Sequence, residues 1–494
     1  MNPLTTVIPY SPGPSFDGIL LPLTKADLVE HIVIVSQEPV RFKLEKCQVL
    51  VAGPLTSDET LNPILTGMRT EHFLLFPEPR QISIEPEALE KILGKAESQK
   101  AGLVYSDFYD ENEHWKTLHP LIDYQPGSVR DDFDFGSMML FSVAAARKAL
   151  EKYGAIPHVK FAAVYDLRLK VSIDHAIYHL QEPLYGAMRA EEISDVEKVF
   201  EYVDPSNEAV QKEMEAVFTD HLKRIRAYLP SQSLREVEKT PESFPVEASV
   251  IIPVRNRRET IAEAVGSVLS QEANFPYNII VVDNHSADGT TAVLSDLARQ
   301  YPSLKHHIPK RTDLGIGGCW NEALRHQACG RYAVQLDSDD LYSSRRTLQK
   351  IVNVLRQGNY AMVIGSYILV DSKLEEIPPG LIDHREWTDE NGHNNALRIN
   401  GLGAPRAFNS GLMRKIGFLN VSYGEDYAAA LRICREYRIG RIFESLYLCR
   451  RWSGNTDAAL SIEEENRNNA FKDKTRTIEI FARQKMTEGI AQNP

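Results

Sequence analysis

The feature that most constrains the fold is an alternation of strand-like and helix-like segments that begins after residue 245. The apolar runs "ASVIIPV", "YNIIVVDN" and "RYAVQLD" are typical of buried strands. Between them, "RRETIAEAVGSVLSQ" and "DGTTAVLSDLARQY" have helical spacing of their apolar residues. Because strands that alternate with helices favour parallel pairing, the pattern predicts a three-layer α/β domain around a parallel sheet.

Acidic residues fall at the carboxyl ends of two of these predicted strands. Asp283 ends "YNIIVVD", and Asp337, Asp339 and Asp340 follow the strand "RYAVQL". Ligands of α/β sheets bind outside the carboxyl ends of the strands. Clustered carboxylates there bind Mg²⁺ or Mn²⁺, which in turn hold a substrate diphosphate. Such clusters are also common turn formers, so the motif alone leaves both interpretations open.

Length and composition restrict the classes of protein to consider. A chain of 494 residues is too long for one ordinary core, so we expect two or three domains. A net charge of −12 argues against broad nucleic-acid or anionic-membrane binding. No apolar run approaches the ~20 residues of a membrane span, and "MNPLTTVIPYSPGPSFDG" lacks the pattern of a signal peptide. We expect a cytoplasmic protein, with peripheral membrane association as an alternative.

The first half of the chain has a weak sequence similarity to the second half. Residues 85–109 align without a gap on residues 344–368, and a neighbouring register places Glu78 on Asp337 and Arg80 on Asp339. We interpret this as an internal duplication whose first copy has lost the carboxylate cluster. The charged, helix-prone and finally Pro-rich stretch between the halves predicts a helical connector. The domains expected are therefore 1–190, a connector 191–245, a second domain 246–455, and a helical extension 456–494.

Four motifs follow one another in the second half: "VIIPVRNRRETI", "IIVVDNHSADGTT", "LGIGGCWNEAL" with "CGRYAVQLDSDD", and "YGEDYAAALR" with "LYLCRRW". In this order they make residues 246 to about 455 resemble an inverting glycosyltransferase of family 2, whose GT-A fold is a Rossmann-like three-layer fold. Each motif alone would be weak. Through the repeat, the resemblance implies an α/β protein with two tandem GT-A-like domains joined by a helical linker, the first of them degenerate.

The resemblance implies a set of donor-binding residues. Asp283 corresponds to the acid that recognises the nucleotide base, and a buried carboxylate can accept N–H bonds from a base edge. The alternative for Asp283 is a turn that closes the strand. The full donor set is Pro253, Val254, Asn256, Glu259, Asp283, Asn321, Asp337, Ser338 and Arg451.

The resemblance also implies the metal and catalytic residues. Asp337 and Asp339 correspond to a D-x-D pair that holds Mn²⁺ or Mg²⁺, a Lewis acid that offsets the charge of the leaving diphosphate. Asp426, after Glu425, corresponds to the base that takes the proton of the acceptor hydroxyl. Glu425 alone is also explained as an acid in the first turn of a helix.

Acceptor contacts are assigned to Asp340 and Trp387, although Asp340 alternatively orients a loop amide and Trp387 alternatively anchors its loop to the core. The sequence departs from the processive Q-x-x-R-W pattern, because Leu448 stands where the Gln is expected. This departure argues against a membrane-embedded polysaccharide synthase. In the first copy, Ala163 and Val164 occupy the place of the acidic pair, which predicts a non-catalytic domain.

The sequence thus predicts a metal-dependent inverting transfer of sugar from a nucleoside diphosphate sugar to a hydroxyl acceptor, which is a glycan, a glycoside or a glycolipid precursor. A nucleotidyltransferase is the alternative enzyme, but no lysine-bearing Gly-rich loop opens the domain. The alternative from another class is an inactive scaffold made of two transferase-like halves. The donor base, the sugar, the acceptor and homo-oligomer formation stay open at this stage.

Overall fold

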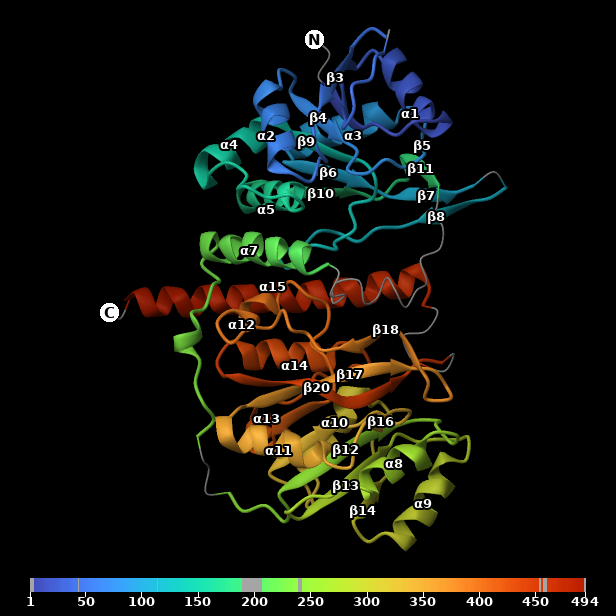
Figure 1. The fold of residues 1–494 in the computed structure, drawn as a ribbon, viewed down its shortest axis with the longest axis vertical. Helices are drawn as coiled ribbons and strands as arrows, with labels where there is room; N and C mark the ends of the chain where they lie inside the picture. Colours follow the sequence, from blue (N-terminus) through green and yellow to red (C-terminus); the bar gives the residue numbers. More distant parts are fainter. Residues whose placement is uncertain are drawn as a thin grey trace. The chain divides into compact units, whose positions relative to one another are not determined.

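The computed structural model describes residues 4–42, 44–112, 114–188, 207–238, 242–452, 455 and 460–492 (Figure 1). The chain divides into two compact units. Unit 1 comprises residues 1–198, 208–228 and 460–494, and unit 2 comprises residues 199–207 and 229–459. Helix α7 (Glu208–Arg224) of the predicted connector and helix α15 (Ile462–Gln492) of the predicted extension therefore belong to unit 1. Residues 191–206 of the predicted connector lie outside the described residues.

Unit 2 is built on one mixed sheet of nine strands with the order β14-β13-β12-β15-β19-β17-β20-β16, and β18 pairs with β17. Strands β12 to β15 are parallel, whereas β19 is antiparallel to both β15 and β17. The predicted α/β class is confirmed, but the sheet is mixed rather than wholly parallel. The strands are β12 (Ala248–Val254), β13 (Tyr277–Asp283), β14 (Leu304–His307), β15 (Tyr332–Gln335), β16 (Leu341–Tyr342), β17 (Met362–Val370), β18 (Glu376–Ile382), β19 (Arg406–Asn409) and β20 (Ile439–Arg450).

The helices of unit 2 cover a sheet whose central strands are buried on both faces. Every residue of β13 from Asn278 to Asp283 is buried, as a strand between two helical layers requires. Helix α8 buries Ile261, Ala264, Val265 and Val268, the spacing of one helical face. The helices are α8 (Ile261–Leu269), α9 (Thr290–Gln300), α10 (Ile316–Arg325), α11 (Thr347–Gly358), α12 (Gly392–Asn395), α13 (Ser410–Ile416) and α14 (Glu425–Cys434).

Unit 1 contains a seven-stranded sheet, β10-β6-β9-β4-β1-β2-β3, and a four-stranded sheet, β5-β11-β7-β8. Its strands are β1 (Leu4–Pro9), β2 (Val29–Ser36), β3 (Cys47–Val51), β4 (His72–Leu75), β5 (Ile82–Ile84), β6 (Leu103–Ser106), β7 (Phe108–Glu111), β8 (Lys116–His119), β9 (Met139–Ser142), β10 (Ile177–Leu180) and β11 (Tyr185–Met188). Besides α7 and α15, its helices are α1 (Pro14–Lys25), α2 (Asp58–Gly67), α3 (Ala88–Gln99), α4 (Val143–Tyr153) and α5 (Ala163–Asp174).

The two units share one strand topology. The order β3-β2-β1-β4-β9-β6-β10 of unit 1 matches β14-β13-β12-β15-β19-β17-β20 of unit 2, and each neighbouring pair has the same relative direction. The sheet β5-β11-β7-β8 likewise matches the pairing of β16, β20, β17 and β18. Ser142 and Asn409 even cap the helices after β9 and β19 in the same way. The units differ between β2 and β3, where the described residues of the connection contain no helix corresponding to α9.

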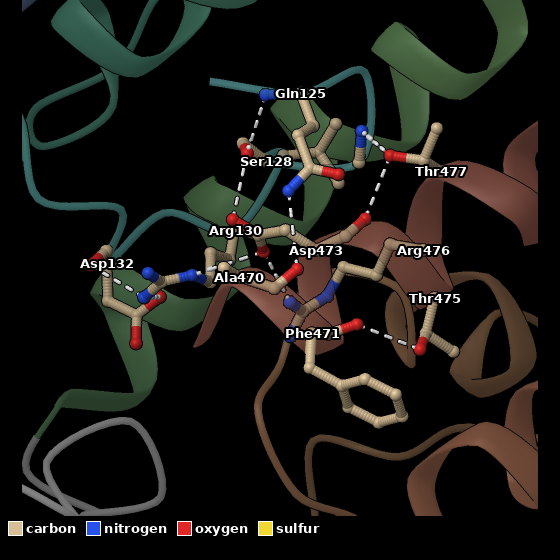
Figure 2. A network of polar contacts seen from close by, with 12 residues as sticks. Gln125, Ser128, Arg130, Asp132, Ala470, Phe471, Asp473, Thr475, Arg476 and Thr477 are labelled. Atoms are coloured by element: carbon tan, nitrogen blue, oxygen red, sulfur yellow. Dashed lines mark hydrogen bonds and ion pairs between the residues drawn. The ribbon is translucent and has the colours of Figure 1, made fainter. Parts of the chain in front are cut away.

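Helix α15 is anchored in unit 1 by a buried polar network (Figure 2). The carboxylate of Asp473 accepts hydrogen bonds from Ser128 Oγ (2.8 Å) and from Arg476 Nη1 (2.7 Å), and it lies 3.5 Å from Arg130 Nε. Asp473 and Arg476 have no exposed surface. At Gly127 the backbone approaches the helix so closely that an added Cβ would lie 2.1 Å from the carbonyl oxygen of Asp473. The helix is therefore an integral part of unit 1.

None of the helices in the described part of the chain is both long and apolar enough to cross a lipid bilayer. The five cysteines are free thiols, and three of them are buried.

Candidate functional site

The carboxyl ends of three adjacent parallel strands, β13, β12 and β15, form one edge of the sheet in unit 2. Val254 pairs with Asp283 at the end of β12 and β13, and β15 runs beside β12 up to Gln335. Asp283 and the cluster that begins at Asp337 therefore lie along the same edge. This is the edge at which α/β sheets bind ligands.

Asp283 is buried and is held by three hydrogen bonds. Its Oδ2 accepts from Thr291 Oγ1 (2.6 Å) and lies 3.2 Å from His306 Nε2, and its Oδ1 accepts from the backbone N–H of Ser286 (3.0 Å). Burial alone would raise the pKa of Asp283, but the hydrogen bonds from His306, Thr291 and Ser286 outweigh it and hold the pKa well below its usual range. The turn expected as an alternative is present. The sequence did not predict the histidine, which β14 places beside the end of β13.

The loop after β12 is fixed to the loop after β13 by Asn256. Its Oδ1 accepts from the backbone N–H of Ala287 (2.8 Å), and its own N–H donates to Ser286 Oγ (2.9 Å). Asn256 has a left-handed backbone with φ of 54°, a conformation that asparagine tolerates better than most residues. Val254 is buried, Pro253 is half-buried, and Glu259 is exposed on the same loop.

Asp337, the first acid of the D-x-D pair, is fixed from both sides. Gln335 Nε2 donates to both carboxylate oxygens of Asp337 (3.1 and 3.0 Å). The backbone N–H of Asp337 donates to the hydroxyl of Tyr447 (3.0 Å). Burial raises the pKa of Asp337 although Arg406 opposes the shift, and the negative charge of Asp339 adds to it. A cation bound here would offset the repulsion between the carboxylates of Asp337 and Asp339.

Asp339 is held by contacts at the rim of the cluster. Its Oδ2 accepts a hydrogen bond from Trp452 Nε1 (3.2 Å) and lies 3.5 Å from Arg257 Nε. The guanidinium of Arg257 also lies 5.9 Å from the ring of Trp452, within range of a cation–π contact. The arginine was not predicted as a site residue, although it lies next to Asn256 in the first motif.

Asp340 and Ser338 face the protein interior. Asp340 Oδ1 accepts the backbone N–H of Arg450 (2.7 Å), and burial raises the pKa of Asp340 well above its usual value, with further contributions from Asp337 and Asp339. Arg450 is the last residue of β20, so Asp340 orients an amide at the end of a strand rather than the loop amide expected as the alternative to acceptor binding. The carbonyl of Ser338 accepts from Thr260 Oγ1 (2.9 Å).

Helix α14 begins at Glu425, the first member of the acidic pair. The side chain of Asp426 is 29% exposed, and its Oδ2 lies 2.6 Å from Arg406 Nη2. Glu425 is buried, and burial followed by the charge of Asp426 raises its pKa to about 8. The close approach of α10 contributes to this burial, because a Cβ added at Gly317 would lie 3.0 Å from Glu425 Cβ. The two neighbouring acids therefore differ in environment, and Asp426 is the more accessible.

We expect Glu425→Gln to stabilise unit 2 in a pH-dependent way. A glutamate in the unfolded chain ionises near pH 4.5, whereas Glu425 of the folded protein holds its proton up to about pH 8. Between these values the unfolded state binds fewer protons, so the stability of the wild type falls by roughly 1.4 kcal/mol per pH unit as pH rises. Glutamine removes this loss. Urea denaturation from pH 5 to 9 should show a gap between variant and wild type that widens up to pH 8 and then stays constant.

The control for this experiment is Glu272→Gln, which removes an exposed carboxylate that pairs with Arg345. Its stability should follow that of the wild type at every pH because exposed ion pairs contribute little. A constant gap between Glu425→Gln and the wild type across the pH range would contradict the assignment of a raised pKa to Glu425.

Asn321 of the third motif links α10 to the segment before α14. Its Nδ2 donates to the carbonyl of Phe418 (2.8 Å), and its Oδ1 accepts the N–H of the same residue (2.9 Å). Both halves of its amide are therefore engaged by backbone rather than pointing freely toward a donor site. The motif's asparagine therefore holds the segment before α14 against α10, a contact that the sequence did not predict.

Trp387 and Arg451 were both expected to contact a substrate, and the structure gives them different surroundings. Trp387 is 7% exposed, and its ring packs against Gly392 and lies 5.7 Å from the guanidinium carbon of Arg441. A ring covered in this way does not present a face for a sugar, so the structure agrees with the alternative in which Trp387 anchors its loop. Arg451 extends the β20 ladder, since its N–H donates to the carbonyl of Val370 (2.7 Å).

The carboxylates of the D-x-D pair suit a hard divalent cation as ligands. Asp337 and Asp339 offer only carboxylate oxygens, the ligands that Mg²⁺ and Mn²⁺ prefer, and such ions are commonly held by one or two carboxylates with the substrate phosphates. Across the part of the chain that the structure describes, no group of three or more histidine, cysteine or acidic side chains forms a complete metal site.

The matching positions of unit 1 carry different chemistry. Helix α5 begins with Ala163, at the place where α14 begins with Glu425. Glu78 and Arg80, which follow β4, form an ion pair at 3.1 Å. Three other acids of unit 1 lie in pairs with basic side chains: Asp107 with His179, Asp110 with His119, and Asp166 with Lys170. The acidic constellation of unit 2 thus has no counterpart at these positions.

Comparison with known proteins gives matches in the same region. Residues 249–416 match the family model Glycosyl transferase family 2. EpsE of Bacillus subtilis is 33% identical over 124 residues, which are 25% of this chain and 44% of EpsE. The minor teichoic acid biosynthesis protein GgaB of the same organism is 31% identical over 113 residues, 23% of this chain and 12% of GgaB. The chain thus spans less than half the length of either relative.

Solved structures are similar at a lower level. TarS 1–349 of S. aureus in complex with UDP-GlcNAc is 21% identical, with a TM-score of 0.38, over 47% of this chain and 66% of that chain. The mannosyltransferase PcManGT of Pyrobaculum calidifontis in complex with GDP-Man and Mn²⁺ is 19% identical, with a TM-score of 0.34, over 57% and 86%. The family model carries the assignment: residues 249–416 of this chain form a glycosyl transferase family 2 domain.

Proposed function

We propose that unit 2 transfers a sugar from a nucleoside diphosphate sugar to a hydroxyl acceptor with inversion at the anomeric carbon. The observation that carries this proposal is the position of two acidic groups around Arg406. The guanidinium of Arg406 forms an ion pair with Asp426 of the acidic pair. Its charge also interacts with that of Asp337 of the D-x-D pair. A donor held at Asp337 and an acceptor hydroxyl at Asp426 would then meet in one site.

The residues divide into a donor side and an acceptor side. The donor side consists of Asp283 for the base, the Pro253 to Asn256 loop for base and ribose, and Asp337 and Asp339 for Mn²⁺ or Mg²⁺. When bound, the cation supplies a Lewis acid for the diphosphate. On the acceptor side, Asp426 takes the proton of the hydroxyl while its oxygen bonds to the anomeric carbon and the bond to the diphosphate oxygen breaks. Glu259, Asn321, Ser338 and Arg451 complete the predicted donor set. Asp340 and Trp387 were predicted to contact the acceptor, but the proposed reaction uses no contact with the covered ring of Trp387.

We further propose that unit 1 is a degenerate, non-catalytic copy of the same GT-A-like fold. The shared strand order and directions support a duplication. The alanine at the start of α5 and the ion pair of Glu78 with Arg80 support the loss of chemistry. The boundaries that follow from this proposal are 1–190 and 246–455, with α7 and α15 packed on unit 1.

The test is the thermal stability of the full chain with UDP, GDP, CMP and TDP and their sugars, each with and without Mn²⁺. A ligand that binds only the native state stabilises it by about 2.7 kcal/mol at a hundredfold excess over its Kd. This stabilisation raises the melting temperature. We expect one nucleotide to raise the melting temperature only with metal.

The same experiment with Asp339→Ala should lose the metal-dependent shift because a carboxylate ligand is removed. Asp296→Ala is the matched control, since this exposed acid of α9 forms an ion pair with Arg299, one turn further along the same helix. Absence of a shift with every nucleotide would favour the inactive scaffold instead, and a shift that Asp339→Ala retains would contradict the D-x-D assignment.

A further inference from the structure

Arg406 is the residue of the site whose role neither the motifs nor the family assignment explains. It is the first residue of β19, and its side chain is 17% exposed. Nη2 lies 2.6 Å from Asp426 Oδ2, and Nη1 donates to the carbonyl of Gly403 (2.7 Å). The guanidinium is thus fixed at both ends, with one nitrogen on the acid that we propose as the base.

A second connection runs from Arg406 to the D-x-D pair. The backbone N–H of Arg406 donates to Gln335 Oε1 (3.1 Å), and Nε2 of the same glutamine donates to both oxygens of Asp337. Gln335 is the last residue of β15, the strand that pairs with β19. One glutamine and one arginine therefore join Asp337 to Asp426 by direct contacts.

The charge of Arg406 is maintained by the acids around it. Burial would lower the pKa of the guanidinium, but the charges of Asp426, Asp337 and Glu425 outweigh it and raise the pKa. The contact between this charged guanidinium and the carboxylate of Asp426 is therefore charge-assisted, which fixes its geometry more firmly than a neutral hydrogen bond would.

We propose that Arg406 is a positioning residue for the transfer reaction: it orients the carboxylate of Asp426 toward the acceptor and, through Gln335, fixes its distance from the donor side. This inference rests on the proposed function of unit 2. It differs from a purely stabilising ion pair in one respect, because a stabilising pair would affect folding and leave the kcat of the folded protein unchanged.

The test compares Arg406→Met and Arg406→Lys with the wild type, measuring kcat and KM for the donor that the stability panel identifies. In Arg406→Met the kcat should fall at least about tenfold, because nothing then fixes the orientation of the Asp426 carboxylate. The KM for the donor should stay close to that of the wild type. The metal-dependent rise in melting temperature with nucleotide should persist, since the donor side is intact.

Arg406→Lys separates charge from geometry. Lysine keeps the positive charge, but a single ammonium group cannot hold both Asp426 and the Gly403 carbonyl in the planar arrangement of arginine. The kcat should therefore fall by about tenfold in this variant too, while the KM for the donor stays close to that of the wild type. This variant also keeps the proposal testable if Arg406→Met does not fold, because it leaves no acid without a cation.

The matched control is Arg414→Met. Arg414 lies on α13 in the same unit and pairs with Glu242, away from the acidic pair, so its removal should leave the kcat unchanged. Wild-type kcat in Arg406→Lys or in Arg406→Met would overturn the role of Arg406 alone. Absence of transfer and of nucleotide binding in the wild type would instead reject the proposed function itself.

Discussion

Replacing Asp426 by asparagine should lower kcat by about 10²- to 10⁴-fold, the range that a positioned general base contributes. Asparagine has nearly the shape of aspartate but cannot take a proton at neutral pH. Asp426 is suited to be the base because it is the more exposed acid of the pair and is ion-paired with Arg406, whereas burial raises the pKa of Glu425 to about 8. The donor side contains neither residue, so nucleotide binding should be unaffected.

This prediction is checked by steady-state transfer assays together with the melting temperature in the presence of nucleotide and Mn²⁺. Asp313→Asn serves as the matched control, because this exposed acid pairs with Arg311 on the surface of unit 2. Its kcat should equal that of the wild type. Turnover by Asp426→Asn at more than about a tenth of the wild-type rate would show that another group takes the proton.

The sequence predicted the site best where an acidic residue directly follows an apolar run that is typical of a strand. Asp283 and Asp337 end apolar runs whose strand character is unambiguous, so their shared edge followed from the parallel pairing of β12 with its neighbours. The register of the repeat was also informative, because it placed Ala163 at the position of Glu425 and both residues begin a helix. Local patterns of this kind require no knowledge of side-chain packing.

The sequence could not predict contacts that depend on strands brought together from distant segments. Arg406 follows a polar loop and resembles a surface charge in the sequence, yet antiparallel pairing of β19 with β15 places it between Gln335 and Asp426. Trp387 likewise looked available for a sugar, and only the packing of Gly392 against its ring shows that it is covered. Both cases depend on pairing that a single sequence does not specify.

The C-terminal helix was expected as an extension, and its membership of unit 1 leads to the second large prediction. Asp473→Ala should destabilise unit 1 by about 3 to 5 kcal/mol, the cost of removing one partner from a buried ion pair. The carboxylate is fully buried between Arg476 and Arg130 and also accepts the hydroxyl proton of Ser128 (Figure 2). Alanine would leave two buried guanidinium groups without this carboxylate.

The measurement is urea denaturation of the full chain, followed by limited proteolysis to identify which unit opens first. Asp132→Ala is the matched control within the same network, since Asp132 also pairs with Arg130 (2.9 Å) but its side chain is 54% exposed. Its loss should cost no more than about 1 kcal/mol because water replaces an exposed partner. Equal destabilisation by both variants would mean that the burial of Asp473 is not what holds α15 in unit 1. A large difference, with early cleavage near α15 in Asp473→Ala alone, is the expected result, because only a buried carboxylate leaves uncompensated charge behind when it is removed.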